Sequence, residues 1–354
     1  MLTPRRSALV LLVALAACRA ASDSPTAPNV TAPIGGAAFA KPVDPGYKVY
    51  QDGNTIDAQT QPSGGAYLAG GGTDVDAGMV WLMGQGGTRS AGQYGDVVVL
   101  RTSGSNGYNK YLVRLGANSV TSIVITSIAG ANSDVVTNAI AKAEVVFIAG
   151  GDQSTYVNLW RGTALQTAVN ARVAQGYPIG GTSAGLAVLG QYVYAALNAS
   201  AQSDIVLQNP FDSSVTLQPA LFNVPLLANV LTDSHFQTRD RMGRLLVFLA
   251  RLQEDGMASA PRAIAVDEGS GVGVSADGIT TTFGTGVGAY YLSVAKNAKR
   301  VCEANTPLTY SLVSTVHVTN GGDFTLGSWT STSSSPYALS VSNGVVSSST
   351  GSIY

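Results

Sequence analysis

Charged residues, cysteine and histidine are all scarce in this 354-residue chain. Only 12% of the residues are charged and the formal net charge is -1, which excludes the basic surface that nucleic-acid binding requires. Two cysteines exclude a cysteine-rich metal site and a disulfide framework. The two histidines, His235 and His317, leave little choice of a general base at neutral pH. The 45% of hydrophobic residues suffice for a sizeable core.

Residues 1–18 have the pattern of an export signal. Arg5 and Arg6 precede an apolar run over 8–17 that is too short to span a bilayer. The letters LAAC at 15–18 resemble the lipobox of bacterial lipoproteins, in which Cys18 would carry the lipid; with Arg19 next, the resemblance implies an outer-membrane destination. The alternative is ordinary cleavage and free secretion. We therefore expect an exported protein, periplasmic or anchored in the outer membrane, or secreted.

Three further segments follow the signal. Residues 19–45 are rich in Ala, Pro, Ser and Thr and predict a flexible linker. Residues 46–300 predict an α/β domain, and residues 301–354 predict a β-rich segment that completes it. If Cys18 is lipidated, Cys302 has no disulfide partner, and we expect it to fill a buried apolar niche.

Apolar, β-branched runs alternate with stretches of helical spacing in the first half of the α/β domain. Strands are expected at 66–70, 96–100, 122–125, 145–149 and 177–180, and helices at 75–83, 108–115, 134–142 and 156–174. This alternation predicts a mostly parallel sheet sandwiched by helices, with ligands at the carboxyl ends of the strands. Beyond residue 263 short strands dominate, and residues 331–354 predict either a final hairpin or a loose tail.

The segment Gly181-Thr182-Ser183-Ala184-Gly185 predicts a nucleophile elbow. An apolar approach precedes it and a helix-like run, 186–190, follows it. A tight strand-to-helix turn lifts the Ser183 hydroxyl clear of the backbone, and the flanking glycines let neighbouring chain pack closely. The N–H of Ala184 would then point to where an oxyanion forms.

Ser183 needs a base, and the base needs an acid that orients it. His235 follows the apolar run 224–231, whereas His317 lies in an alternating run and is expected on a strand surface. Asp267 and Glu268 come directly after the apolar strand 263–266. Consecutive strand residues point to opposite sides, so only one of the two acids can face the site, and the residues alone leave open which.

Several motifs occur together in an order that resembles the cyanophycinase family of serine exopeptidases, which are relatives of the aspartyl dipeptidases. The motifs lie at 70–77, 149–153, 180–185, 233–244 and 266–268. The resemblance implies a class I glutamine amidotransferase-like α/β sandwich. It also implies Ser183 as the nucleophile, His235 as the base and Glu268 as the orienting acid.

The remaining site residues come from two of these motifs. The turn 150–153 follows a strand and opens a helix, so the Gly151 amide can be the second oxyanion donor while Gln153 binds substrate. Asp233 and three arginines, expected on one helical stretch, are implied as substrate-pocket residues: Arg239, Arg241 and Arg244. Neither a metal nor an organic cofactor is implied. The partners expected are a peptide or cyanophycin-like polymer and a membrane reached only through the lipid; a homodimer is left open.

Ser234 departs from the family pattern, in which glutamine usually stands between the aspartate and the histidine. Cyanophycin has a poly-aspartate backbone with arginine on each side-chain carboxyl, so an altered pocket bears on whether this polymer is the substrate. Two other functions stay open. An α/β-hydrolase-like esterase would use Ser183, Asp267 or Glu268, and His317 in that order. A surface lipoprotein could instead keep the fold and only bind a peptide.

Overall fold

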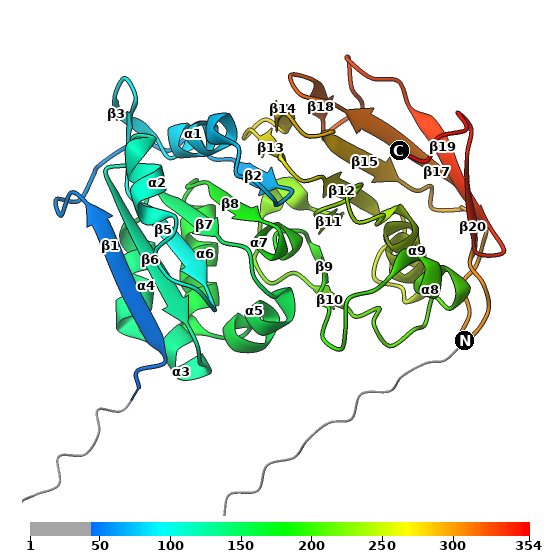
Figure 1. Ribbon diagram of the computed structural model, residues 1–354, viewed down its shortest axis with the longest axis horizontal. Coiled ribbons are helices and arrows are strands. Elements are labelled where there is room, and N and C mark those ends of the chain that lie inside the picture. The colour runs from blue at the N-terminus through cyan, green and yellow to red at the C-terminus, as the bar shows by residue number, and fades with distance from the viewer. Residues whose placement is uncertain (1–43) are drawn as a thin grey trace, which may run out of the picture. The chain divides into compact units, whose positions relative to one another are not determined.

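Parallel strands form the centre of the first sheet in the computed structural model, which describes residues 44–354 (Figure 1). The sheet order is β1 (Tyr47–Gly53), β6 (Ser119–Ile125), β5 (Val97–Arg101), β7 (Val145–Ile148), β8 (Ile179–Thr182), β2 (Ala66–Ala69), β13 (Ser270–Val274), β14 (Ile279–Gly284) and β18 (Asp323–Thr325). The strands from β6 to β2 in this order pair in parallel, and the outer pairs are antiparallel. The expected α/β fold is confirmed.

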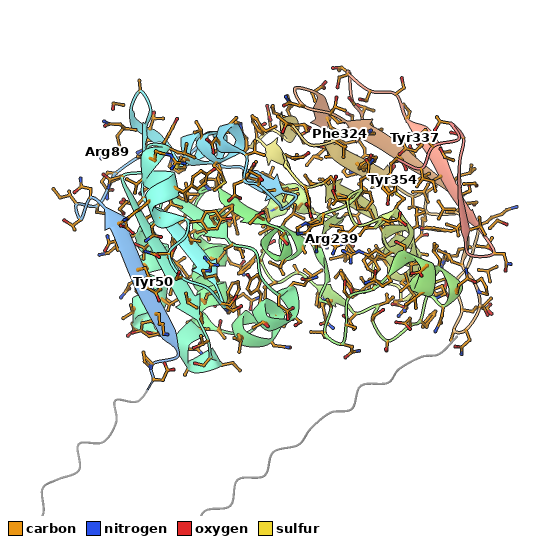
Figure 2. All side chains as sticks on the ribbon, in the orientation of Figure 1. Tyr50, Arg89, Arg239, Phe324, Tyr337 and Tyr354 are labelled. Atoms are coloured by element: carbon orange, nitrogen blue, oxygen red, sulfur yellow. The ribbon has the colours of Figure 1, made fainter. Side chains whose placement is uncertain are left out.

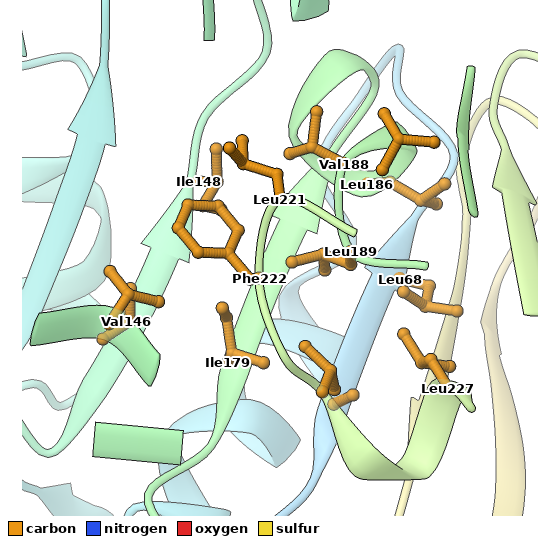
Figure 3. Packing of buried hydrophobic residues seen from close by; sticks show 14 of the residues in the cluster. Leu68, Val146, Ile148, Ile179, Leu186, Val188, Leu189, Leu221, Phe222 and Leu227 are labelled. Atoms are coloured by element: carbon orange, nitrogen blue, oxygen red, sulfur yellow. The ribbon is translucent and has the colours of Figure 1, made fainter. Parts of the chain in front are cut away.

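Helices cover both faces of this sheet because its central strands are apolar on both sides. Val98 and Leu100 of β5 share a buried cluster with α4 and α6, whereas Val97 and Val99 share another with α1 and α2. The helices are α1 (Asp76–Gln85), α2 (Asn109–Arg114), α3 (Ile128–Ala131), α4 (Asp134–Lys142), α5 (Gln153–Trp160), α6 (Ala164–Ala174) and α7 (Ala184–Ala187). Figure 3 shows apolar side chains of β7, β8 and α7 packed together.

The second sheet is mostly antiparallel and contains the strands from β9 (Tyr192–Tyr194) onward other than β13, β14 and β18. Its order is β10 (Leu217–Pro219), β9, β11 (Val230–Asp233), β12 (Arg262–Val266), β15 (Ala289–Ser293), β17 (Thr309–Val318), β19 (Tyr337–Ser342) and β20 (Val345–Ser348), with β16 (Arg300–Val301) paired to β17. Helices α8 (Ser203–Gln208) and α9 (Met242–Glu254) pack on it, and η1 (Pro225–Leu227) precedes β11. A separate hairpin joins β3 (Thr88–Ser90) to β4 (Gln93–Tyr94).

Some expected elements have different bounds. The helix expected over 156–174 is two helices, because Gly162 takes a left-handed φ of 73° between α5 and α6. The helix-like run after Ser183 is a single turn, α7, that ends at Ala187. The strand expected at 177–180 is β8, two residues later. Residues 337–348 form a hairpin of β19 and β20, so the alternative of a loose tail over 331–354 is wrong there.

The signal peptide, Cys18 and nearly all of the linker lie outside the described residues and stay predictions. The boundary expected at 300/301 likewise stays a prediction. Among residues 44–354, no helix is both long and apolar enough to cross a membrane.

We predict that Gly271→Ala destabilises the fold. A Cβ at Gly271 would lie 2.2 Å from the hydroxyl of Tyr67, which is fully buried on the neighbouring strand β2. Overpacking of this kind costs about 1–3 kcal/mol of unfolding free energy, which guanidinium denaturation measures. Gly327→Ala is the matched control, because nothing lies within 4 Å of its added Cβ. Equal stability of the two variants would contradict the packing argument.

Candidate active site

Ser183 lies at a strained turn between β8 and α7. Its φ of 55° and ψ of -119° are rare for a residue with a side chain and cost about 1–3 kcal/mol. Close packing surrounds the turn, since a Cβ on Gly185 would lie 2.1 Å from the Ile148 carbonyl oxygen and one on Gly181 would lie 2.4 Å from the Gly185 carbonyl oxygen. These are the two glycines of the predicted elbow. The turn presents the Ser183 hydroxyl to the cavity described below.

His235 reaches the same hydroxyl from the second sheet. It follows β11, and its Nε2 lies 2.6 Å from Ser183 Oγ. Its φ of 46° is also left-handed. Its side chain is only 9% exposed, so the imidazole is largely shielded from water. The contact can transfer a proton from serine to histidine.

The two consecutive acids after β12, Asp267 and Glu268, contact different residues. Glu268 Oε1 lies 2.5 Å from His235 Nδ1, which fixes the imidazole with Nε2 toward Ser183. Asp267 is buried and turns the other way, where it accepts bonds of 2.9 Å from the amide and the hydroxyl of Thr238. Glu268 is therefore the acid that contacts the histidine, while Asp267 braces the turn that follows it.

Three successive carbonyls at the end of β2 hold the backbones of Ser183, of His235 and of Gly269, the residue after Glu268. The sequence analysis missed this feature, although the glycine run lies within the motif at 70–77. The carbonyls of Ala69, Gly70 and Gly71 accept from the amides of Ser183 (3.1 Å), His235 (2.8 Å) and Gly269 (3.0 Å), respectively. A Cβ on Gly71 would lie 2.3 Å from His235 Cε1. The imidazole therefore occupies space that only glycine leaves free.

Burial and the neighbouring charged groups shift the pKa of His235, and not all in the same direction. Burial lowers the pKa of His235, the hydrogen bond to Glu268 raises it, and the nearby Arg239 lowers it again. The hydrogen bond from His235 lowers the pKa of Glu268, and Arg239, whose Nη2 lies 3.5 Å from Glu268 Oε1, adds to this. The histidine is thus neutral, and the glutamate ionised, at neutral pH. That is the charge state in which the imidazole can accept a proton.

A cavity of about 510 Å³ opens in front of Ser183. Gly151, Ala184 and Gln153 line it, and Ala184 begins α7, so its N–H has no intrahelical partner. The loop over 196–200 forms another wall that the sequence analysis did not identify, because it carries no recognisable motif. The other lining residues are Asp152, Ser154, Ser234, His235, Arg239 and Arg241. The predicted oxyanion donors thus lie around the same space as the nucleophile.

The three arginines have different surroundings. Arg239 and Arg241 precede α9, which begins at Met242, so the expected single helical stretch is wrong; the left-handed Asp240 between them interrupts it. Figure 2 labels Arg239, which is exposed, between the two sheets. Arg241 donates to the Ser234 carbonyl at 2.8 Å; burial lowers its pKa to about 10, so it stays charged at neutral pH.

Arg244 and Asp233 form a buried ion pair and do not line the 510 Å³ cavity. Both side chains are only 2% exposed, and Arg244 Nε donates to Asp233 Oδ2 at 2.9 Å. Arg244 instead lines a neighbouring cavity of about 150 Å³ together with Arg239 and Arg241, and the expected substrate role of the pair stays a prediction. Their role here is to fix the end of β11, and hence His235, against α9.

The second histidine and the second cysteine lie elsewhere. His317, on β17, has its Nε2 2.6 Å from the Val287 carbonyl oxygen, and its ring stacks on Tyr290 with centroids 4.2 Å apart. It is not the partner of Ser183 in this structure. Cys302 is buried, and burial raises the pKa of its thiol to about 12. No cluster of three or more metal-ligating side chains is found within residues 44–354.

Part of this chain is similar to a known family of peptidases. Residues 106–255, which include Ser183 and His235, match the model of peptidase family S51. A cyanophycinase of Geminocystis herdmanii (strain PCC 6308) is 33% identical over 116 residues, covering 32% of this chain and 39% of that protein. A cyanophycinase of Synechococcus elongatus is 27% identical over 180 residues, covering 51% of each chain. The expected resemblance to the cyanophycinase-like S51 peptidases is confirmed over these residues.

The matched segments span about half or less of each curated relative. Among solved structures, a peptidase from an acI-B1 Actinobacterium is similar with a TM-score of 0.49 and 15% identity, covering 76% of this chain and 99% of that one.

We predict that Glu268→Gln lowers the pKa of His235, because the carboxylate stabilises the imidazolium. Arg239→Gln should shift the same pKa upward, since it removes a repelling positive charge. The measurement is an NMR titration of the imidazole Cε1 proton. His317 serves as the internal reference, and His317→Gln assigns the two signals. Shifts of equal sign in the two variants would contradict the electrostatic account.

We predict that Arg244→Met lowers the free energy of unfolding by at most about 3–5 kcal/mol, because the buried Asp233 carboxylate loses its closest partner and keeps only Arg241, whose Nη1 lies 3.7 Å away. The double variant Asp233→Asn/Arg244→Met should lose less, since no buried carboxylate remains without its closest partner. Arg239→Gln, at a side chain 51% exposed, is the control and should change stability by at most about 0.5 kcal/mol. Urea unfolding measures all three. A cost for Arg244→Met no larger than for Arg239→Gln would refute the assignment.

Proposed function

We propose that this chain is a serine exopeptidase of cyanophycinase type, which hydrolyses cyanophycin or related aspartyl peptides through an acyl-enzyme. The observation that carries the proposal is the line of contacts from Ser183 Oγ through His235 to Glu268 Oε1. The match to peptidase family S51 over residues 106–255 supports it. The names of the cyanophycinase relatives support the substrate class.

Acylation uses the three contacts in turn. As Ser183 Oγ attacks the carbonyl carbon of the scissile peptide, its proton moves to His235 Nε2, and Glu268 stabilises the imidazolium. The carbonyl oxygen becomes an oxyanion, for which the amides of Gly151 and Ala184, two residues that line the cavity, are the proposed donors. The tetrahedral intermediate collapses when His235 returns the proton to the leaving amine. An ester between substrate and serine remains.

Deacylation repeats the sequence with water. His235 Nε2 accepts a proton from a water molecule, whose oxygen attacks the ester carbonyl. The second tetrahedral intermediate expels Ser183 Oγ, which takes the proton back from the histidine. The products are a free carboxylic acid and the original enzyme, so protons and electron pairs balance.

The charges of the cavity favour an anionic substrate. Arg239 and Arg241 line it together with one acid, Asp152, whose Oδ1 accepts from the Ser154 amide at 2.8 Å. The planar guanidinium group suits a carboxylate. An aspartyl residue with a free carboxylate supplies such a group. Ser234, where the resembling family usually has glutamine, leaves a smaller polar side chain at the cavity wall. We therefore extend the proposal from cyanophycin to related aspartyl peptides.

The two alternative functions, an esterase and a protein that only binds peptides, would need other arrangements of these residues. An esterase that used His317 would have to break its contact with the Val287 carbonyl and bring the ring to Ser183. A protein that only bound peptides would have no use for a strained serine in hydrogen-bond contact with a buried histidine. Both are therefore weaker candidates than the peptidase.

We predict serine-dependent release of β-aspartyl-arginine or of free aspartate when the protein is incubated with cyanophycin and a panel of aspartyl dipeptides. Ser183→Ala and His235→Ala should each lower kcat/KM by at least about 10³-fold, because each removes a member of one functional unit. His317→Ala is the matched control and should retain activity. Liquid chromatography with mass detection quantifies the products.

Each outcome of this assay has a distinct meaning. Cleaved aspartyl dipeptides with intact cyanophycin would keep the mechanism and narrow the substrate. Loss of activity in His317→Ala with retention in His235→Ala would replace the peptidase by the esterase. No serine-dependent hydrolysis of any peptide in the panel would contradict the proposed function.

A further inference from the structure

The turn over 236–241 carries the two arginines of the cavity and is held by hydrogen bonds to four side chains. Tyr290 donates to the Gln237 side chain at 2.6 Å, and Asp267 accepts from Thr238. These two contacts hold the half of the turn nearest His235. The other half, around Asp240, is held by contacts from Tyr354 and Ser203.

Tyr354 follows the β19–β20 hairpin and reaches the turn with its hydroxyl. The hydroxyl donates to Asp240 Oδ1 at 2.9 Å and accepts from the amide of Met242 at 2.9 Å. Its ring packs edge-on against Phe236 and Tyr290, with centroids 6.0 and 5.8 Å apart. One side chain thus joins both ends of the segment that contains Arg241.

The segment leading to Tyr354 is itself anchored. Tyr337 on β19 donates its hydroxyl proton to the Ile353 carbonyl at 3.1 Å. Ile353 and Tyr354 pack against the buried cluster beneath the second sheet. Figure 2 labels Tyr337 and Tyr354 on this β-rich side of the chain. The position of the Tyr354 hydroxyl is therefore set by the hairpin side of the structure, independently of the triad.

Asp240 is the residue that needs this support. Its φ of 47° is left-handed, a conformation that a residue with a side chain adopts at a cost. The guanidinium groups of Arg239 and Arg241 lie 3.5 and 3.7 Å from the carboxylates of Glu268 and Asp233, respectively. The Asp240 carboxylate lies between the two arginines in sequence, and if free it would be a further competitor with a substrate carboxylate. The hydrogen bond to Tyr354 directs Oδ1 to the hairpin side instead.

We propose that Tyr354 is a positioning residue for substrate binding, which holds the Asp240 turn so that Arg239 and Arg241 are available to an anionic substrate. The inference rests on the proposed function, because it takes these arginines as the substrate-binding groups. It adds a residue outside every motif identified in the sequence. The β-rich final segment thereby contributes to the affinity of the site.

The effect of Tyr354 is separable from the chemical step. His235 is held by the Gly70 carbonyl, by the space above Gly71 and by Glu268, none of which contacts Tyr354. Arg239 lowers the pKa of His235, so the comparison is made at neutral pH or above, where the histidine is already neutral. Under that condition, loss of the Tyr354 hydroxyl should weaken anion binding and leave the reactivity of Ser183 unchanged. A merely structural role would lower both together.

The test measures the rate at which an uncharged alkyl fluorophosphonate labels Ser183, with and without N-acetyl-aspartate as the competing anion. In Tyr354→Phe the labelling rate without competitor should equal that of the natural sequence. The inhibition constant of N-acetyl-aspartate should rise roughly tenfold, and KM for any cleaved aspartyl peptide should rise in parallel. Tyr310→Phe is the matched control, since it removes a hydroxyl of the same buried cluster that donates to Gln253.

A second variant tests whether the Asp240 carboxylate causes the weaker anion binding. Asp240→Asn keeps an acceptor oxygen, removes the competing charge and tolerates a left-handed φ better. In the Tyr354→Phe background it should return the inhibition constant to within about threefold of the natural value. Failure of this rescue would overturn the role assigned to Asp240.

The remaining outcomes separate the two proposals. Equal protection by N-acetyl-aspartate in Tyr354→Phe and the natural sequence would overturn the inference and leave the proposed function standing. A fall in the uncompeted labelling rate of Tyr354→Phe would show a general structural role and would also overturn it. Absence of Ser183 labelling in the natural sequence would overturn the proposed function, and the inference with it.

Discussion

Three successive carbonyl groups at the end of β2 hold this site together. Ala69, Gly70 and Gly71 accept the amides of Ser183, His235 and Gly269, which come from three separate parts of the chain. Two strained residues, Ser183 and His235, keep their left-handed φ because these hydrogen bonds and the close glycine contacts leave no alternative position. Parallel strands end at the same edge of a sheet. The pairing of β2 with β8 therefore brings the Ala69 carbonyl directly to the Ser183 amide.

The second sheet supplies the histidine that contacts Ser183 and the glutamate that contacts this histidine in turn. It positions His235 at the end of β11 and Glu268 after β12, two parallel neighbours. The buried pair of Asp233 and Arg244 secures the end of β11 against α9, and the turn that follows carries the arginines of the cavity. The low charge of the chain thus coexists with a cluster of paired charges at the site. Glu268 lies 3.5 Å from Arg239, and Asp233 pairs closely with Arg244 and lies 3.7 Å from Arg241.

Local signals predicted much of this arrangement. The apolar runs of β5 and β7 predicted buried strands, and the glycines beside Ser183 predicted the elbow, since both depend on neighbours in sequence. The choice between Asp267 and Glu268 could not be made from the residues because it depends on the direction of each side chain beyond the strand end. The pair of Asp233 and Arg244, 11 residues apart, depends on how α9 packs beside β11, which the residues alone do not give. The contact between Met242 and Tyr354 joins residues 112 apart and was likewise not predictable.

The central claim is that His235, held neutral in its buried place, activates Ser183. The most direct test is the pH dependence of Ser183 phosphonylation by an uncharged fluorophosphonate, with peptide mapping of the adduct. The account predicts an adduct on Ser183 whose rate of formation rises with pH through a single ionisation below the ordinary pKa of histidine, because burial lowers that pKa. A rate that does not depend on pH across this range, or an adduct on another residue, would contradict it.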